Sequence, residues 1–142
     1  MTRTLLIAIG NPLRRDDGVA HRVLELLGPQ FDGEARSVLQ LTPELAAEIA
    51  GCERVVFLDA DAEAAEIQIE ALTPVASSPA LTHVSTPAEI VALASALFGF
   101  TGRAVLWRIP AADFSFHEGL TAVSEAAAWR AASAITHETQ SL

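Results

Sequence analysis

The sequence predicts an α/β fold, a single-domain three-layer sandwich in which a mainly parallel, twisted sheet carries helices on both faces. Two observations predict it. Short apolar runs, typical of buried strands, alternate with helical patterns along the whole chain. The 142 residues are 51% hydrophobic, which is enough for one domain, residues 1–142, with a substantial core.

Five segments are predicted to form strands. Each is a short run of apolar or β-branched residues, and the predicted strands are 4–10, 35–41, 54–60, 65–72 and 103–110. Segment 65–72 alternates apolar and polar residues, which is typical of a half-exposed or edge strand.

Four segments have the apolar spacing of helices, namely 18–28, 42–51, 86–99 and 120–136. Thr42 is expected to cap the second helix, with Pro43 at its first position and Gly51 at its end. Thr86 and Glu89 have the spacing of a capping box at the start of the third. The residues after 136 are expected to form a frayed tail.

The charge and the apolar runs exclude several classes of partner. A net charge of −9 argues against a nucleic-acid partner, because phosphate binding requires a basic surface. The apolar runs are too short to span a membrane, and the start of the chain lacks the pattern of a secretory leader. The single cysteine, Cys52, cannot form an internal disulfide. We therefore expect a cytoplasmic protein, a monomer, that binds neither nucleic acids nor membranes.

Polar side chains gather where the predicted strands end, which is where open α/β sheets bind ligands. Asp16 and Asp17 follow the first strand, Asp59 and Asp61 end the third, and His83 lies in the loop before the capped helix. Two carboxylates and one imidazole on separate loops would make a metal site with open positions. Mixed oxygen and nitrogen ligands suit zinc or nickel.

Each of these residues also has a purely structural interpretation. Asp16 or Asp17 could cap the helix that begins near residue 18. Asp61 already lies in a turn and is therefore a weaker candidate for a site residue than Asp59. His21, in the first predicted helix, and His117, in the loop before the last, compete with the loop histidine as nitrogen ligands. His137 belongs to the expected tail.

Standard catalytic motifs are missing from the sequence. It contains no HExxH, P-loop or GxSxG motif, and the glycines of a dinucleotide-binding loop are incomplete. Cys52 has no evident base nearby in sequence. A metal site at the sheet edge is therefore a hypothesis that rests on residue types and their placement alone.

The segment IAIGNPLRRDDGVAHRVLELL, residues 7–27, resembles the N-terminal signature of the hydrogenase maturation proteases. These are nickel-dependent endopeptidases that process the large subunit of [NiFe] hydrogenases. Four further segments resemble the family in the same order: VVFLDA, THVSTPAEIVALASALFG, VLWRIP and HEGLTAVSEAAAWRAASAI. The resemblance runs over nearly the full chain.

The resemblance implies a function and a set of site residues. It implies a metal-dependent or aspartic-type endopeptidase that removes the C-terminal extension of a [NiFe] hydrogenase large-subunit precursor after nickel insertion. Asp17, Asp59 and His83 would be both the catalytic residues and the metal ligands. The Ni²⁺ is carried by the precursor, and Zn²⁺ or Cd²⁺ could occupy the same ligands. Asp16 would support the site or cap the helix, and Asn11 would shape the turn.

Two other functions remain open at this point. The chain could be a non-proteolytic binding or chaperone module of the same fold that acts on a metalloprotein partner. It could also be an α/β domain for a small ligand, in which Asp16 and Asp17 are only caps. Arg14 and Arg15 are interpreted either as a solvated loop tip or as a contact for the substrate tail.

Overall fold

Five strands form one sheet in the order β2-β1-β3-β5-β4 in a computed structural model that describes residues 3–74 and 85–140. The strands are β1 (Thr4–Ile9), β2 (Glu34–Val38), β3 (Arg54–Asp61), β4 (Gln68–Leu72) and β5 (Arg103–Pro110). Neighbouring strands pair in parallel except β4, which pairs antiparallel with β5 at the edge of the sheet. The predicted mainly parallel sheet and its edge strand are confirmed.

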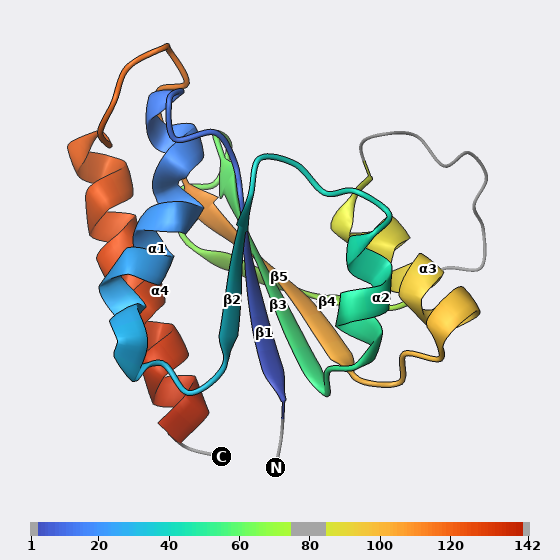
Figure 1. The fold of residues 1–142 in the computed structure, drawn as a ribbon. Coiled ribbons are helices and arrows are strands. Elements are labelled where there is room, and N and C mark those ends of the chain that lie inside the picture. Colours follow the sequence, from blue (N-terminus) through green and yellow to red (C-terminus); the bar gives the residue numbers. More distant parts are fainter. Residues whose placement is uncertain (1–2, 75–84, 141–142) are drawn as a thin grey trace.

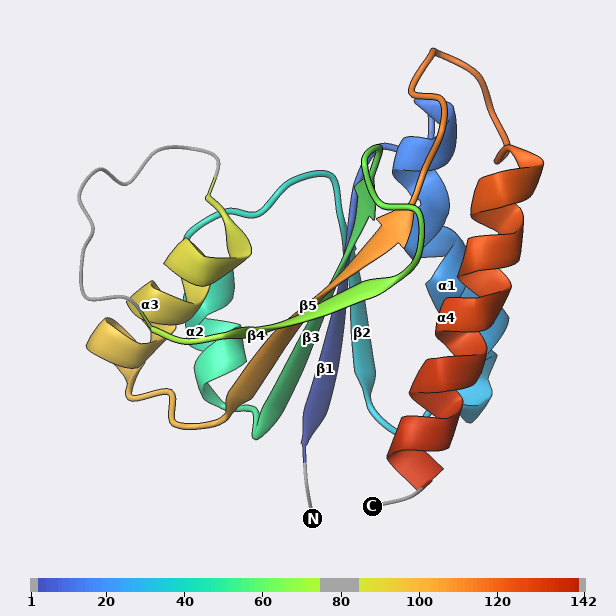
Figure 2. The same cartoon turned by 180° about the vertical axis from the view of Figure 1, so that it is seen from behind.

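Helices cover both faces of this sheet (Figure 1). They are α1 (Val19–Leu27), α2 (Leu45–Ala50), α3 (Pro87–Phe98) and α4 (Ala122–Gln140), with short 3-10 helices η1 (Arg15–Gly18) and η2 (Gly28–Gln30). Figure 2 shows the same arrangement from behind, with α1 and α4 on one face and α2 and α3 on the other. The three-layer sandwich predicted from the sequence is therefore present.

The central strands are buried on both faces, which explains why they are continuous apolar runs in the sequence. In β1, Leu5 and Ile7 join the core under α2 and α3, whereas Leu6 and Ala8 join the core under α1 and α4. Alternation of side chains across a strand produces this division. One short segment thus contributes to both hydrophobic cores.

Two predicted helix boundaries need correction. The expected N-cap role of Thr42 is wrong, because α2 begins at Leu45 and no side chain caps it. The carbonyls of Thr42 and Pro43 instead accept hydrogen bonds from the amides of Leu45 and Ala46, so a turn precedes the helix. The last helix continues to residue 140, so the expected tail is helical and His137 lies near its end.

Other local predictions hold. The Thr86 hydroxyl accepts a hydrogen bond from the Glu89 amide at 3.1 Å, and the Glu89 carboxylate accepts one from the Thr86 amide at 2.9 Å. This is the predicted capping box. Gly51 ends α2 as expected. No helix within residues 3–74 and 85–140 is long and apolar enough to cross a membrane.

The parallel strands β1, β3 and β5 all end at one edge of the sheet, the upper edge in Figure 1. We call this the carboxyl edge, and the opposite edge, where these strands begin, the amino edge. η1 follows the end of β1, and segment 111–121 leaves the end of β5. Figure 1 shows this segment lying beside η1 and the start of α1.

Candidate functional site

Gly10 allows η1 to fold back against the end of β1. Its φ of 142° lies in a region that side chains rarely adopt. A Cβ at this position would also lie only 1.9 Å from the carbonyl oxygen of Asp17. Both the backbone angle and the close contact require glycine, and together they place the acidic pair at the strand end.

Asp17 is half-buried at this position. Its Oδ2 accepts a hydrogen bond from the Asn11 amide at 2.7 Å, and Asn11 Oδ1 accepts one from the Leu13 amide at 2.9 Å. The expected role of Asn11 in shaping the turn is thus confirmed. Within the described residues this amide is the only donor to the Asp17 carboxylate. Among the described residues, the carboxylate therefore keeps most of its capacity for a further partner.

Asp59 lies near the end of β3 and is also half-buried. Burial raises its pKa from 3.8 to about 6, and the negative charges of Asp17 and Asp61 add to this rise. The Ala60 amide, which donates to Asp59 Oδ1 at 2.9 Å, and the charge of Arg108 act in the opposite direction. The charge of Asp17 thus lies close enough to Asp59 to contribute to its raised pKa.

Asp61 has a structural role. Its Oδ1 accepts a hydrogen bond from the Glu63 amide at 2.8 Å, which closes the turn after β3. Its carbonyl accepts one from the Ala111 amide at 3.2 Å. The backbone of Asp61 therefore joins the end of β3 to the chain that leaves β5, in agreement with its weaker case as a site residue.

Asp16 does not cap the helix that follows it, so that interpretation is wrong. Its fully buried carboxylate instead accepts four hydrogen bonds from segment 111–121. Oδ2 accepts from the amides of Ala112 and Asp113 at 2.7 and 3.0 Å and from the Thr121 hydroxyl at 2.7 Å. Oδ1 accepts from the Thr121 amide at 2.8 Å.

These hydrogen bonds explain how a buried carboxylate stays charged. Burial alone would raise the pKa of Asp16, but the hydrogen bonds from Thr121, Ala112 and Asp113 outweigh it, and the pKa is lowered. Thr121 is also the residue before α4, and its hydroxyl accepts a bond from the Ser124 amide at 3.3 Å. Asp16 therefore supports the site by anchoring segment 111–121 and the start of α4.

The histidines lie in different parts of the fold and have different contacts. His21 Nε2 lies 2.7 Å from the Gly10 carbonyl, which can only accept, so this nitrogen donates and ties α1 to the end of β1. His117 Nδ1 lies 2.6 Å from the Glu118 carbonyl on the exposed segment after β5. His137 is in α4, remote from this edge. His83 lies outside the described residues.

Two of the three metal ligands implied by the resemblance are thus found near each other. Residues 3–74 and 85–140 contain no group of three acidic, histidine or cysteine side chains that could hold a metal ion. They do contain the Asp17 and Asp59 pair, whose mutual repulsion is part of the raised pKa of Asp59. Two carboxylates with excess negative charge suit a divalent cation that brings further ligands with it.

Arg14 and Arg15 contact segment 111–121, which the sequence did not reveal. Arg14 Nε donates to the Phe114 carbonyl at 3.2 Å, and its guanidinium lies 5.5 Å from the centre of the Phe116 ring. Arg15 Nη1 is 3.7 Å from a carboxylate oxygen of Asp113. Both arginines thus bind segment 111–121, about a hundred residues away, and no local pattern in the sequence pairs them.

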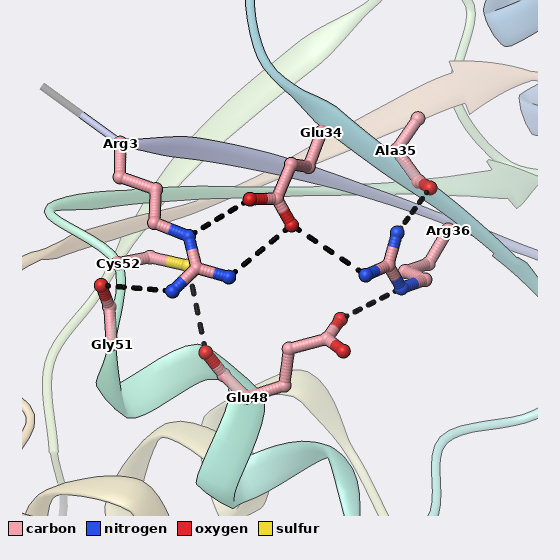
Figure 3. Close-up of polar contacts among 7 residues, drawn as sticks. All are labelled: Arg3, Glu34, Ala35, Arg36, Glu48, Gly51 and Cys52. Atoms are coloured by element: carbon pink, nitrogen blue, oxygen red, sulfur yellow. Dashed lines mark hydrogen bonds and ion pairs between the residues drawn. The ribbon is translucent and has the colours of Figure 1, made fainter.

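Cys52 lies at the amino edge, just before β3 begins, whereas Asp59 lies near the other end of that strand. Figure 3 shows the surroundings of Cys52. Its thiol is buried, and its Sγ contacts the Glu48 carbonyl at 3.5 Å. Burial raises the pKa of this thiol, which disfavours the reactive thiolate. Burial and the raised pKa both argue against a nucleophilic role for Cys52.

Comparison with known proteins shows likeness in structure. No family model matches the sequence, and no curated protein is detectably similar to it. A [NiFe] hydrogenase maturation protease, HycI from Thermococcus kodakarensis KOD1, matches 96% of this chain and 91% of its own, with a TM-score of 0.72 and 21% identity. The maturating endopeptidase HybD from E. coli matches 98% and 93%, with a TM-score of 0.70 and 20% identity.

An uncharacterized protein from Wolinella succinogenes is similar as well, at 24% identity and a TM-score of 0.67, over 99% of this chain and 98% of its own. The chain therefore has the fold of hydrogenase maturation proteases over nearly its whole length. The likeness noted in the sequence is confirmed at the level of the fold, which several solved structures share at 17–24% identity.

Proposed function

We propose that this chain is a metal-dependent endopeptidase that removes the C-terminal extension of a [NiFe] hydrogenase large-subunit precursor after nickel insertion. The single observation that carries the proposal is the pairing of Asp17 and Asp59 at the carboxyl edge. Asp17 lies in η1 and Asp59 near the end of β3, on a fold shared with enzymes of this activity, and this placement supports the proposal.

In this proposal the nickel belongs to the substrate, and Asp17, Asp59 and His83 bind it from the protease side. Burial leaves Asp59 poorly solvated, so its carboxylate gains more from a cation than an exposed one would. Asp17 is held in place by the Asn11 amide and by the close packing against Gly10. The bound nickel would polarise the scissile carbonyl or a water molecule.

The chain's own contribution is positioning. Binding the precursor through its nickel holds the scissile bond beside Asp17 and Asp59, and such proximity can supply a large part of the rate enhancement. Asp16 supports this arrangement through segment 111–121 and contacts no substrate. Zn²⁺ or Cd²⁺ could take the place of Ni²⁺ on the same ligands.

The proposal extends to the setting of the reaction. Residues 1–142 act as one hydrogenase-maturation-protease-like domain, a monomer in the cytoplasm, with the precursor as its protein partner. The net charge of −9 supports the absence of a nucleic-acid partner. The proposed reaction does not require a membrane.

Asp17→Asn tests the proposal directly. The asparagine Oδ1 can still accept the Asn11 amide, so the fold is kept while the negative charge is lost. We expect conversion of nickel-loaded precursor to fall at least about 100-fold, as for loss of a metal ligand. The measurement is the mass of the large subunit after incubation with each variant.

Asp61→Asn is the matched control, because asparagine can accept the Glu63 amide and preserve the turn. We expect this variant to process the precursor at nearly the normal rate. Normal processing by Asp17→Asn would contradict the proposal. Binding of the loaded precursor without cleavage by the unaltered chain would instead support the non-proteolytic module.

A further inference from the structure

Two large apolar side chains are exposed beside the candidate site. Phe116 is 82% exposed and Leu13 is 58% exposed. Leu13 lies between the end of β1 and η1, and Phe116 lies in segment 111–121. We call Leu13, Arg14 and Phe116 together the docking rim.

The backbone under the docking rim is firmly held. The Arg15 amide donates to the His117 carbonyl at 2.9 Å, and the His117 amide donates to the Leu13 carbonyl at 3.0 Å. Asp16 anchors the same segment with its four hydrogen bonds. The apolar side chains are thus presented on a fixed backbone, which lowers the entropy lost when a partner binds.

Arg14 adds a positive charge to this rim. Its guanidinium stacks on the Phe116 ring at 5.5 Å, within the range of a cation–π contact. No carboxylate lies within ion-pair distance of Arg14 among the described residues, whereas Arg3, Arg22 and Arg108 are each paired with a glutamate. In a chain of net charge −9, the docking rim thus carries a positive charge that has no ion-pair partner among the described residues.

The position of the docking rim indicates which partner would cover it. The Arg14 carbonyl accepts a hydrogen bond from the Asp17 amide at 3.0 Å, so the rim is one turn from the acidic pair. Segment 111–121 begins beside Asp61, whose carbonyl binds the Ala111 amide. The docking rim thus borders the acidic pair, so a protein that reaches Asp17 and Asp59 would pass close to it.

We propose that the docking rim binds the folded body of the metal-loaded precursor, through an apolar patch on the precursor that carries an acidic side chain. The apolar patch would cover Phe116 and Leu13, and the acid would pair with Arg14. This proposal rests on the proposed function for the identity of the partner. It assigns recognition to the rim and chemistry to the acidic pair.

Phe116→Ser tests the docking rim because an exposed side chain can be shortened without loss of core packing. Leu97→Ser is the matched control, since Leu97 is 65% exposed on α3, on the other face of the sheet. The measurements are the Kd for nickel-loaded precursor and the KM and kcat of its processing. We expect Phe116→Ser to raise Kd and KM about tenfold or more and to leave kcat unchanged, with no change for Leu97→Ser.

Arg14→Ala provides the electrostatic half of the test. We expect it to weaken precursor binding and to reduce the dependence of Kd on salt concentration, because one ion pair is lost. Thermal unfolding of each variant checks that the fold is intact. A lower kcat with unchanged KM in Phe116→Ser would overturn docking in favour of a role in shaping the site.

The outcomes separate the two proposals. If the unaltered chain binds the precursor without cleaving it, and Phe116→Ser weakens binding, the proposed protease activity is overturned and the proposed docking rim is supported. If the unaltered chain cleaves and Phe116→Ser binds normally, docking alone is overturned. If the unaltered chain neither binds nor cleaves, both are overturned. A change in self-association on substitution of Phe116, with precursor binding unaffected, would assign the rim to a second copy of the chain.

Discussion

The two edges of the sheet use charged residues in opposite ways. At the amino edge opposite charges alternate, with Arg3 Nε 3.0 Å from Glu34 Oε1 and Arg36 Nε 3.0 Å from Glu48 Oε1 (Figure 3). At the carboxyl edge, Asp17 and Asp59 carry like charges, and the pKa of Asp59 is raised to about 6. The charges at the amino edge are paired within the chain, whereas Asp17 and Asp59 have no ion-pair partner among the described residues.

This contrast shows where the fold tolerates unfavourable electrostatics. Like charges that are half-buried destabilise the folded state unless a cation or a proton joins them. The carboxyl edge can hold such a pair because the backbone there is fixed by other interactions, above all those of Asp16. Three substitutions test this comparison, in decreasing order of expected effect.

Asp16→Asn should have the largest effect on stability. The substitution removes the negative charge that four donors share and turns an amide NH₂ group toward some of them. We expect a loss of about 3 kcal/mol in the free energy of unfolding, typical of breaking a buried charged hydrogen-bond network. Urea unfolding at neutral pH measures it.

The pH dependence of this loss has a defined sign. The folded-state pKa of Asp16 is lowered, so its stabilising contribution is present above the unfolded value of 3.8 and is lost as the pH falls through the folded-state value. Asp113→Asn is the comparison variant, because its side chain can still accept the Ser115 amide and it loses only the partly exposed contact with Arg15, so we expect a much smaller loss. Equal stability of Asp16→Asn and the unaltered chain at neutral pH would contradict the anchoring role.

Asp59→Asn should have the opposite effect and raise stability. The folded-state pKa of Asp59 is raised, so ionisation destabilises the folded state as the pH rises from 3.8 to about 6. Asparagine resembles the neutral acid and can still accept the Ala60 amide. A rise in pKa from 3.8 to about 6 corresponds to about 3 kcal/mol. Because solvent around the partly exposed carboxylate screens part of this, we expect a gain of about 2 kcal/mol in the free energy of unfolding at pH 7.5 without metal, which disappears below pH 4.

Urea unfolding across this pH range, with a chelator present, measures the gain. Asp61→Asn is the comparison variant, and we expect a smaller gain because the charge of Asp61 contributes less to the raised pKa of Asp59 than burial does. The gain should also shrink when a divalent cation is added to the unaltered chain. If Asp59→Asn were less stable than the unaltered chain at pH 7.5, the prediction would be wrong, because the charged carboxylate of Asp59 would then be stabilised by partners within the chain.

Much of the fold could be predicted because its signals are local. The strands of the sheet centre are continuous apolar runs, and Thr86 and Glu89 form a capping box within one turn. Thr42 gave a false signal because the residues after it form a turn before α2 begins. A cap residue indicates where a helix could start, but the backbone hydrogen bonds decide where it does.

The candidate site was predictable only in part. The rule that ligands bind at the carboxyl ends of parallel strands pointed to the acids after β1 and at the end of β3, because it depends on chain order alone. The role of Asp16 could not be found in this way, since its donors lie 96 to 105 residues away in an irregular segment. The sequence also could not separate the neighbouring acids, although one is fully buried and the other half-buried.

Glu48→Gln at the amino edge should have the smallest effect of the three. Glu48 pairs with Arg36, but both side chains are partly exposed to solvent, which screens the attraction. We expect a loss of less than about 1 kcal/mol in the free energy of unfolding, reduced further by 0.5 M salt. A double-mutant cycle with Arg36→Gln isolates the pair from the rest of the network. A coupling free energy between Glu48 and Arg36 as large as the loss in Asp16→Asn would contradict this expectation. It would mean that the ion pairs of the amino edge stabilise the fold as much as the anchoring of segment 111–121 does.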